Sequence, residues 1–381
     1  MRIQLTTILF LLCLSLACTP RDGQAPDSES ERAVPAKLSP YFEPAEEYRD
    51  EMGQFLSPLS FYDGRAVQRR EDWEERRSEI LNKWQEFLGA WPPLIESPEI
   101  EYLKQESRDS FVQKTIRLEV GPENRTTDGY LLIPEGDGQF PAVVVVYYDP
   151  ETGIGLGREL RDFGYQLARR GFVALSIGTP ETMRYYPSKE NAALQPLSAL
   201  AYVAANCWYA LAGLSEVDEE RIGIVGHSYG GKWAMFASCL FERFACGVWS
   251  DGGVVFDETR PNVNFWEPWY LGYEVGKWRD EGVPTAENPR TGAYRELVAK
   301  GHDLHELHAL MAPRPFLVSG GSEDTLERWI ALNHAIAVNE FLGYSNRVAM
   351  TNREGHAPTE ESNEQIYGFF EHFLAHSTGP Q

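Results

Sequence analysis

The alternation of short apolar runs with helical segments restricts the fold of this chain more than any other feature of its sequence. Residues 141–148 form an apolar run that is mostly β-branched, which is typical of a strand buried on both faces of a sheet. The same reasoning predicts strands at residues 111–120, 130–133, 172–177, 222–225, 244–249, 315–319 and 347–350, and helices at residues 157–170, 197–214, 229–240, 326–342 and 361–375. Strands that alternate with helices predict an α/β fold with a mostly parallel sheet flanked by helices.

Composition excludes two broad classes of protein. The chain of 381 residues is 43% hydrophobic, which is enough to bury a large core and excludes a wholly disordered chain. Asp and Glu total 57 against 35 Lys and Arg, so the formal net charge is −22. Nucleic acid is not expected as a partner, because its binding needs clustered cations to replace the counterions of the phosphates.

The first 18 residues are predicted to be an export signal. The apolar segment 3–16 follows a basic start and is too short to span a bilayer comfortably. Residues 14–18 resemble a bacterial lipobox, in which Cys18 would become the lipidated N-terminus, although Ser15 departs from the pattern. Ordinary cleavage after Ala17 is the alternative, and mass spectrometry of the mature N-terminus distinguishes the two. A lipid on Cys18 would be the only membrane attachment.

Three further segments follow the signal. Residues 19–50 are rich in proline and charge and are predicted to be a flexible tether. Residues 51–110 contain a helix at 65–88, whose apolar side chains recur at helical spacing, and are predicted to form a helical bracket on the main domain. Residues 111–381 are predicted to be the catalytic domain.

Cysteine usage favours buried thiols over a disulfide framework. Cys207, Cys239 and Cys246 have apolar neighbours, as expected for small core residues. One disulfide among the three remains open, because connectivity cannot be assigned from sequence.

The strongest chemical motif is G-x-S-x-G at Gly226, Ser228 and Gly230. It follows a short apolar strand and opens a helix, which is the context of a nucleophile elbow. The sharp turn exposes the serine hydroxyl, and glycines on both sides avoid the Cβ clashes that so tight a turn would cause. The sequence therefore predicts Ser228 as a nucleophile.

A serine nucleophile needs a base and an acid. His356 lies in a loop after the last predicted strand, where the base is expected. Asp324, with Glu323 beside it, follows the preceding strand and is the first choice for the acid that orients His356. Asp251, one strand earlier, is the second candidate, because some enzymes with this arrangement carry the acid there.

Two backbone N–H groups are expected to bind the oxyanion. One belongs to Tyr229, directly after the nucleophile, and the other to Tyr148 or Asp149 after the strand at 141–148. No metal or organic cofactor is expected. The closely spaced His302, His305 and His308 rotate about 120° around a helix, so anchoring of the scaffold is favoured over a metal site.

These motifs together resemble the α/β-hydrolase superfamily, in particular acetyl xylan esterases, dienelactone hydrolases and glucuronoyl esterases. The resemblance covers about residues 111–374 and is carried by the elbow at 226–232, the segment 310–315 and Gly355 with His356. Glucuronoyl esterases have a lysine at the position of Lys232, which contacts the uronic sugar, so the resemblance implies the same contact here. A solvent-facing helix lysine is the alternative. Those enzymes also have arginine where this chain has Tyr229.

The resemblance implies a serine hydrolase that cleaves carboxylic esters through an acyl-enzyme, and the predicted signal segment makes it an exported one. An aromatic-rich insertion follows the strand that ends near Trp249, and its Trp266 and Trp269 are candidates for a platform that stacks on sugar rings. A lid packed by its own aromatic residues is the alternative. The expected substrate is an acetyl or uronoyl ester on a polysaccharide. Two other functions remain open: a serine peptidase like prolyl oligopeptidase, and a non-catalytic surface binding protein.

Overall fold

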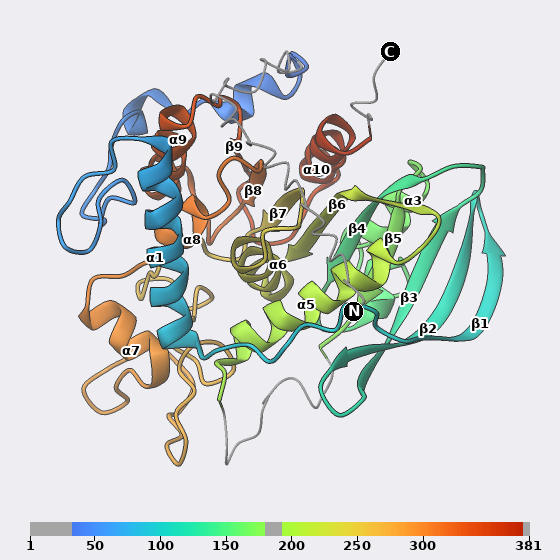
Figure 1. Cartoon of the computed structure of the whole chain (residues 1–381), viewed down its shortest axis with the longest axis horizontal. Helices are drawn as coiled ribbons and strands as arrows, with labels where there is room; N and C mark the ends of the chain where they lie inside the picture. Colours follow the sequence, from blue (N-terminus) through green and yellow to red (C-terminus); the bar gives the residue numbers. More distant parts are fainter. Residues whose placement is uncertain (1–32, 180–192, 376–381) are drawn as a thin grey trace, which may run out of the picture. The chain divides into compact units, whose positions relative to one another are not determined.

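The structure, a computed structural model, describes residues 33–179 and 193–375 (Figure 1). The predicted signal segment, including Cys18, lies outside these residues. Residues 35–381 form one compact unit, and the fold described below belongs to it.

A nine-stranded sheet runs through this unit in the order β1-β2-β3-β5-β4-β6-β7-β8-β9. Strands β4 to β9 are mutually parallel, whereas β1 to β3 are antiparallel to their neighbours. The strands are β1 (Ile100–Arg108), β2 (Phe111–Gly121), β3 (Arg125–Pro134), β4 (Phe140–Val146), β5 (Val173–Ile177), β6 (Val217–His227), β7 (Cys246–Ser250), β8 (Phe316–Gly320) and β9 (Val348–Asn352). The predicted mostly parallel α/β sheet is confirmed.

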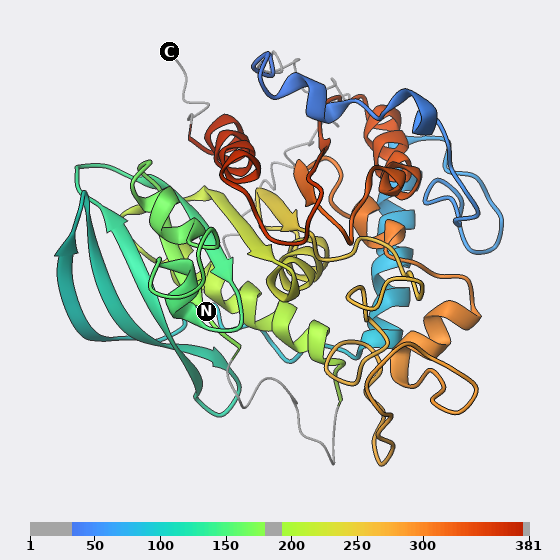
Figure 2. The ribbon, with the colours of Figure 1, turned by 180° about the vertical axis from the view of Figure 1, so that it is seen from behind.

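Helices cover both faces of the sheet (Figures 1 and 2). Helices α5 and α6 lie on one face, and α3 and α10 lie on the other. The helices are α1 (Arg70–Leu88), α2 (Pro150–Gly153), α3 (Phe163–Ala168), α5 (Pro196–Ala212), α6 (Tyr229–Leu240), α7 (Gly292–Ala299), α8 (His305–Ala309), α9 (Trp329–Phe341) and α10 (Glu360–Phe373), with short 3-10 turns at Ser39–Phe42, Glu46–Tyr48 and Leu326–Arg328.

Two differences from the expected elements have local causes. Strand β1 falls inside the predicted bracket at 51–110, and its residues are almost all exposed, so an edge strand gives no apolar periodicity. The predicted helix at 157–170 shortens to α3, because Leu160 adopts a positive φ angle of 58°, which interrupts helical geometry before Phe163.

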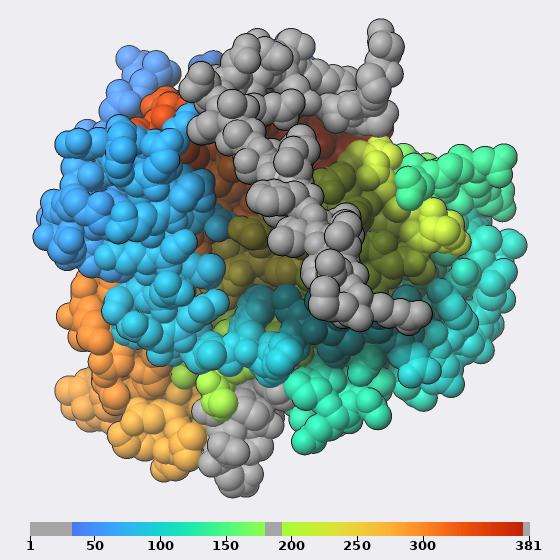
Figure 3. Space-filling view, in the orientation of Figure 1, coloured from blue at the N-terminus to red at the C-terminus, as the bar shows by residue number. Residues whose placement is uncertain are grey.

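Helix α1 packs its apolar face on the main domain. Trp73, Ile80, Trp84 and Leu88 are buried, and the ring of Trp84 lies 6.4 Å from that of Phe236 on α6. Elsewhere α1 contacts α7 and α8, and the space-filling view shows its blue surface continuous with the orange residues below it (Figure 3). The tryptophans of this segment therefore serve packing.

The predicted tether at 19–50 is wrong for its second half. From Pro35 onward the chain docks on the domain, with Leu38 and Phe42 buried. The ring of Phe42 lies 6.2 Å from that of Phe373 on α10. The average composition of the segment is polar, but these two apolar side chains are buried against the domain.

The three described cysteines, Cys207, Cys239 and Cys246, are free and buried, which confirms the expectation of core thiols. Burial raises the pKa of each thiol. Within residues 33–179 and 193–375, no helix has the length and hydropathy needed to cross a membrane.

The histidines near α8 anchor the scaffold. His305 Nε2 donates to Leu56 O at 2.6 Å, and His334 Nε2 donates to Met52 O at 2.9 Å, so the two rings hold the segment before α1. His302 Nδ1 lies 2.8 Å from Glu306 Oε2, and the buried ring of His308 packs 5.2 Å from that of Trp249. Each side chain thus has a packing or hydrogen-bonding role in the scaffold.

His305 is expected to make the protein less stable in acid. Burial lowers the pKa of His305 to about 4, whereas an unfolded histidine titrates near about 6.5. The unfolded state therefore binds the proton first, and stability falls as the pH falls from about 6.5 to about 4. The contribution of His305 lowers the free energy of unfolding by about 2 kcal/mol between pH 7.5 and pH 5. Urea unfolding at the two pH values measures this change.

The matched variant is His305→Gln, which retains a donor for Leu56 O and removes the titration. Its unfolding free energy should lose about 2 kcal/mol less than wild type between the two pH values. An equal loss in wild type and variant would contradict the assignment.

Candidate active site

Ser228 occupies a strained turn between β6 and α6. Its backbone has φ 58° and ψ −113°, a conformation that non-glycine residues seldom adopt. A Cβ on Gly226 would lie 2.2 Å from Gly230 O, and a Cβ on Gly230 would lie 2.1 Å from Val146 O. Both positions therefore require glycine, as the motif predicts. The N–H of Ser228 donates to Ser250 O at 2.7 Å and ties the turn to the end of β7.

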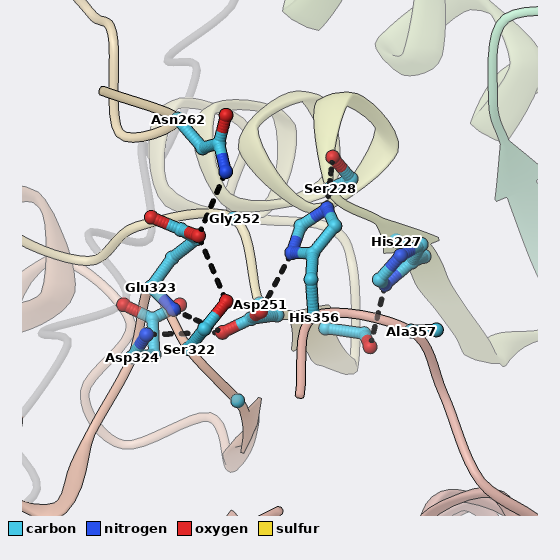
Figure 4. Close-up of polar contacts among 12 residues, drawn as sticks. His227, Ser228, Asp251, Gly252, Asn262, Ser322, Glu323, Asp324, His356 and Ala357 are labelled. Atoms are coloured by element: carbon cyan, nitrogen blue, oxygen red, sulfur yellow. Dashed lines mark hydrogen bonds and ion pairs between the residues drawn. The ribbon is translucent and has the colours of Figure 1, made fainter. Parts of the chain in front are cut away.

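The structure brings Ser228 and His356 together, although 128 positions separate them in the chain. His356 lies in the loop between β9 and α10, and its Nε2 is 2.8 Å from Ser228 Oγ (Figure 4). This is the geometry that a general base needs to remove a proton from the hydroxyl.

The carboxylate at His356 belongs to Asp251, and the expected assignment to Asp324 is wrong. Asp251 Oδ2 lies 2.7 Å from His356 Nδ1 (Figure 4). Asp324 turns its carboxylate away and accepts from the N–H groups of Gly253 at 2.9 Å and Val254 at 2.7 Å. Asp251 was the second candidate from sequence.

The register of the sheet explains the choice of acid. His227 on β6 pairs with Ser250 on β7, so Asp251 leaves its strand at the level of Ser228. The side chain of Asp251 is fully buried, and its Oδ1 accepts from the N–H groups of Glu323 at 3.1 Å and Asp324 at 2.9 Å. Asp324 was expected to be the catalytic acid, but it instead donates its backbone N–H to the carboxylate of Asp251.

Two neighbouring carboxyl groups surround Asp251. Burial, together with the charge of Asp251, raises the pKa of Asp324 to about 6. Glu323 is also buried, and its Oε1 accepts from Asn262 Nδ2 at 3.1 Å and Ser322 Oγ at 2.9 Å. Asp251, Glu323 and His356 bring potential metal ligands within 4.8 Å of one another. Within this group, the bond between Asp251 and His356 suits orientation of the imidazole and stabilisation of its charged form.

His227 lies beside the base. The centres of the His227 and His356 rings are 4.8 Å apart, and His227 Nδ1 is 3.1 Å from Ser250 Oγ. Burial, followed by the neighbouring His356, lowers the pKa of His227 well below its usual value. His227 is therefore uncharged at neutral pH and packs beside the catalytic imidazole.

The two residues expected at the oxyanion site are adjacent. Tyr229 begins α6 directly after Ser228, so its N–H lies at the helix N-terminus. Tyr148 follows β4, and its ring stacks on that of Tyr229 at 4.6 Å and 13°. The oxyanion role of their backbone groups remains a prediction.

Lys232 is not the solvent-facing lysine that was the alternative from sequence. It is 2% exposed, and its ammonium donates to Gly252 O and to Asn262 O. Burial lowers the pKa of Lys232 to about 8. The side chain fastens the chain after Asp251 to α6, and the sugar contact implied by the resemblance remains untested.

The expected carbohydrate platform is wrong for Trp266. This indole is completely buried and donates to Glu267 Oε1 at 2.9 Å, while Glu267 pairs with the buried Arg279 at 3.3 Å. Trp269 is half-buried, and its ring centre lies 6.3 Å from that of Tyr270. The insertion is therefore packed by its own aromatic residues, which was the alternative from sequence.

Three comparisons place this geometry among known proteins. The prolyl oligopeptidase family model matches residues 204–379. A 4-O-methyl-glucuronoyl methylesterase of Schizophyllum commune is 26% identical over 79% of this chain and 76% of its own length. A 4-O-methyl-glucuronoyl methylesterase of Thermothelomyces thermophilus is 24% identical over 51% of this chain. The match spans 48% of that relative's own length, so the chain covers about half of it.

A solved glucuronoyl esterase from Solibacter usitatus superposes with a TM-score of 0.64 at 18% identity, covering 84% of this chain and 97% of that one. The chain therefore has the α/β-hydrolase fold. This α/β-hydrolase shares the fold of the glucuronoyl esterases, as the elbow and the terminal histidine predicted. The sequence signal that could have favoured Asp251 in this α/β-hydrolase is its position directly after the strand next to β6.

The acid of this α/β-hydrolase can be assigned by two matched variants. Asp251→Asn should slow fluorophosphonate labelling of Ser228 by about 10³-fold or more, because the amide favours the wrong His356 tautomer. Asp324→Asn retains an acceptor for Gly253 or Val254 and should slow labelling by less than about tenfold. Melting temperatures control for folding, and a larger loss in Asp324→Asn would reverse the assignment.

Proposed function

We propose that this α/β-hydrolase is an exported serine esterase that cleaves carboxylic esters through an acyl-enzyme. The observation that carries the proposal is the continuous chain of hydrogen bonds from Asp251 through His356 to Ser228, with distances of 2.7 and 2.8 Å. Export rests on residues 1–18, whose predicted lipidation at Cys18 belongs to the same proposal.

The reaction follows from the positions of the three side chains. Ser228 Oγ attacks the ester carbonyl carbon while His356 Nε2 accepts its proton, and Asp251 stabilises the resulting imidazolium. The N–H of Tyr229 and a second N–H from Tyr148 or Asp149 bind the oxyanion. The alcohol leaves with the proton from His356. Water, deprotonated by His356, then releases the acid and restores Ser228.

The proposed substrate is a uronoyl or acetyl ester on a polysaccharide. Support comes from the curated relatives, which are named 4-O-methyl-glucuronoyl methylesterases, and from the glucuronoyl esterase fold. The match to the prolyl oligopeptidase family keeps a serine peptidase as the second candidate, since peptidases use the same triad.

Activity and substrate class are tested in one assay series. A fluorophosphonate should label the wild type and fail to label Ser228→Ala, because only the serine hydroxyl can be phosphonylated. The wild type should release alcohol from a glucuronate methyl ester or acetate from acetylated xylan. Wild type that does not label would exclude the hydrolase, whereas labelling with release of proline dipeptides alone would establish the peptidase.

Tyr148 is the exposed aromatic side chain beside the nucleophile. It is 49% exposed, although its ring is fixed by stacking on Tyr229 and its hydroxyl is engaged with buried Tyr270. A rigid, half-exposed ring loses little entropy when a sugar face covers it. We propose that Tyr148, in place of the buried Trp266, is the stacking surface for the sugar.

Loss of this ring should weaken substrate binding. Tyr148→Ala is expected to raise KM for the sugar ester about tenfold, corresponding to about 1.4 kcal/mol of contact. Tyr148→Phe retains the ring and should keep KM within about twofold of wild type. Equal KM values in the alanine and phenylalanine variants would rule out stacking.

A further inference from the structure

The catalytic histidine lies on a loop that burial alone does not fix. Between β9 and α10, Glu354, Gly355 and Ala357 are exposed, and the side chain of His356 is 33% exposed. A loop with so little buried surface is expected to sample several conformations. Asp251 binds the imidazole itself, but the backbone that carries His356 to its 2.8 Å contact with Ser228 needs a restraint of its own.

The side chain of Arg353 supplies that interaction from within the loop. Its Nη2 donates to His356 O at 2.7 Å, and its Nε donates to Ala357 O at 2.8 Å. The guanidinium thus binds the carbonyl groups of two successive peptides, the one that follows His356 and the one that follows Ala357. Fixing these two carbonyls fixes the direction in which the imidazole leaves the backbone.

The other edge of the same guanidinium binds the end of the sheet. Arg353 Nη1 donates to Ser319 O at 2.8 Å and to Gly320 O at 3.1 Å, at the end of β8. Its backbone N–H also donates to Gly320 O at 3.1 Å. The loop that follows β8 also carries the N–H groups that bind Asp251. The base and the acid are therefore both positioned by hydrogen bonds to the C-terminal end of β8 or to the loop that follows it.

We propose that Arg353 is a positioning residue for catalysis, which sets the alignment of His356 between Asp251 and Ser228. The proposal rests on the proposed esterase function. Besides the loop carbonyls and the end of β8, the guanidinium of Arg353 donates to Ser319 Oγ at 3.2 Å and to Ser250 Oγ at 3.4 Å, and none of these acceptors is a reacting atom. Arginine suits this role because its planar fork presents fixed donors on two edges, whereas lysine has a single flexible ammonium.

The expected signature is a loss of turnover without a loss of stability. In Arg353→Ala the loop carbonyls can bind water instead, and His356 spends less time aligned. With p-nitrophenyl acetate, kcat should fall about 10- to 100-fold while KM changes less than about threefold. The melting temperature should stay within about 3 °C of wild type. Arg353→Lys should recover only part of kcat.

The chain contains a matched control in Arg314. Its guanidinium also binds main-chain carbonyls, those of Ser238, Phe241, Phe244 and Leu310, but on helix and strand ends away from the triad. Arg314→Lys should lower the melting temperature and leave kcat within about twofold of wild type. A purely structural role for Arg353 would give this same pattern in Arg353→Ala, and that result would overturn the proposal.

Rescue gives a second readout that loss of folding cannot imitate. Methylguanidinium added to Arg353→Ala should raise kcat several-fold at concentrations that leave wild type unchanged, and complete failure to do so counts against the proposal. Fluorophosphonate labelling separates this inference from the esterase itself. Wild type that does not label contradicts the esterase, whereas equal labelling rates in wild type and Arg353→Ala contradict only the role of Arg353.

Discussion

The buried carboxylate of Asp251 is the constraint on which the active site depends. A charged group without solvent exposure is costly unless hydrogen bonds replace its water. Asp251 receives three such bonds, from the backbone of Glu323, the backbone of Asp324 and the ring of His356. The acid is therefore satisfied only when the loops after β7, β8 and β9 are all in place, which couples the triad to the sheet.

This coupling works in both directions between neighbouring loops. Asp251 accepts from the loop after β8, while Asp324 in that loop accepts from Gly253 and Val254 after β7. Gly321 makes the close approach possible, since a Cβ there would lie 2.7 Å from Asp251 Oδ2. The loops after β7 and β8 thus hold each other in place. In our proposal, Arg353 binds the loop after β9 to this pair. A site preorganised in this way needs little reorganisation energy during the reaction.

The sequence was sufficient to predict the nucleophile and the base, because the features that define them lie close together in the chain. The strand, the glycines and the helix around Ser228 define the elbow within a few residues, and His356 follows the last strand without a competitor in that loop. The position of Asp251 directly after the strand next to β6 favours it as the acid but does not decide the assignment, because Asp251 and Asp324 follow adjacent parallel strands. Which carboxylate faces the imidazole depends on how the two loops bond to each other, and that pairing is a tertiary property.

Aromatic residues near the site show the same limit. Composition does not separate Trp266 from Tyr148, but Trp266 is completely buried beside Glu267, whereas Tyr148 is half-exposed. A ring that fills a core cannot also present a face to a sugar. Tyr229 directly follows the nucleophile, and its ring stacks on that of Tyr148. The surface that these two rings form beside the nucleophile is aromatic and uncharged, which is consistent with the stacking role proposed for Tyr148.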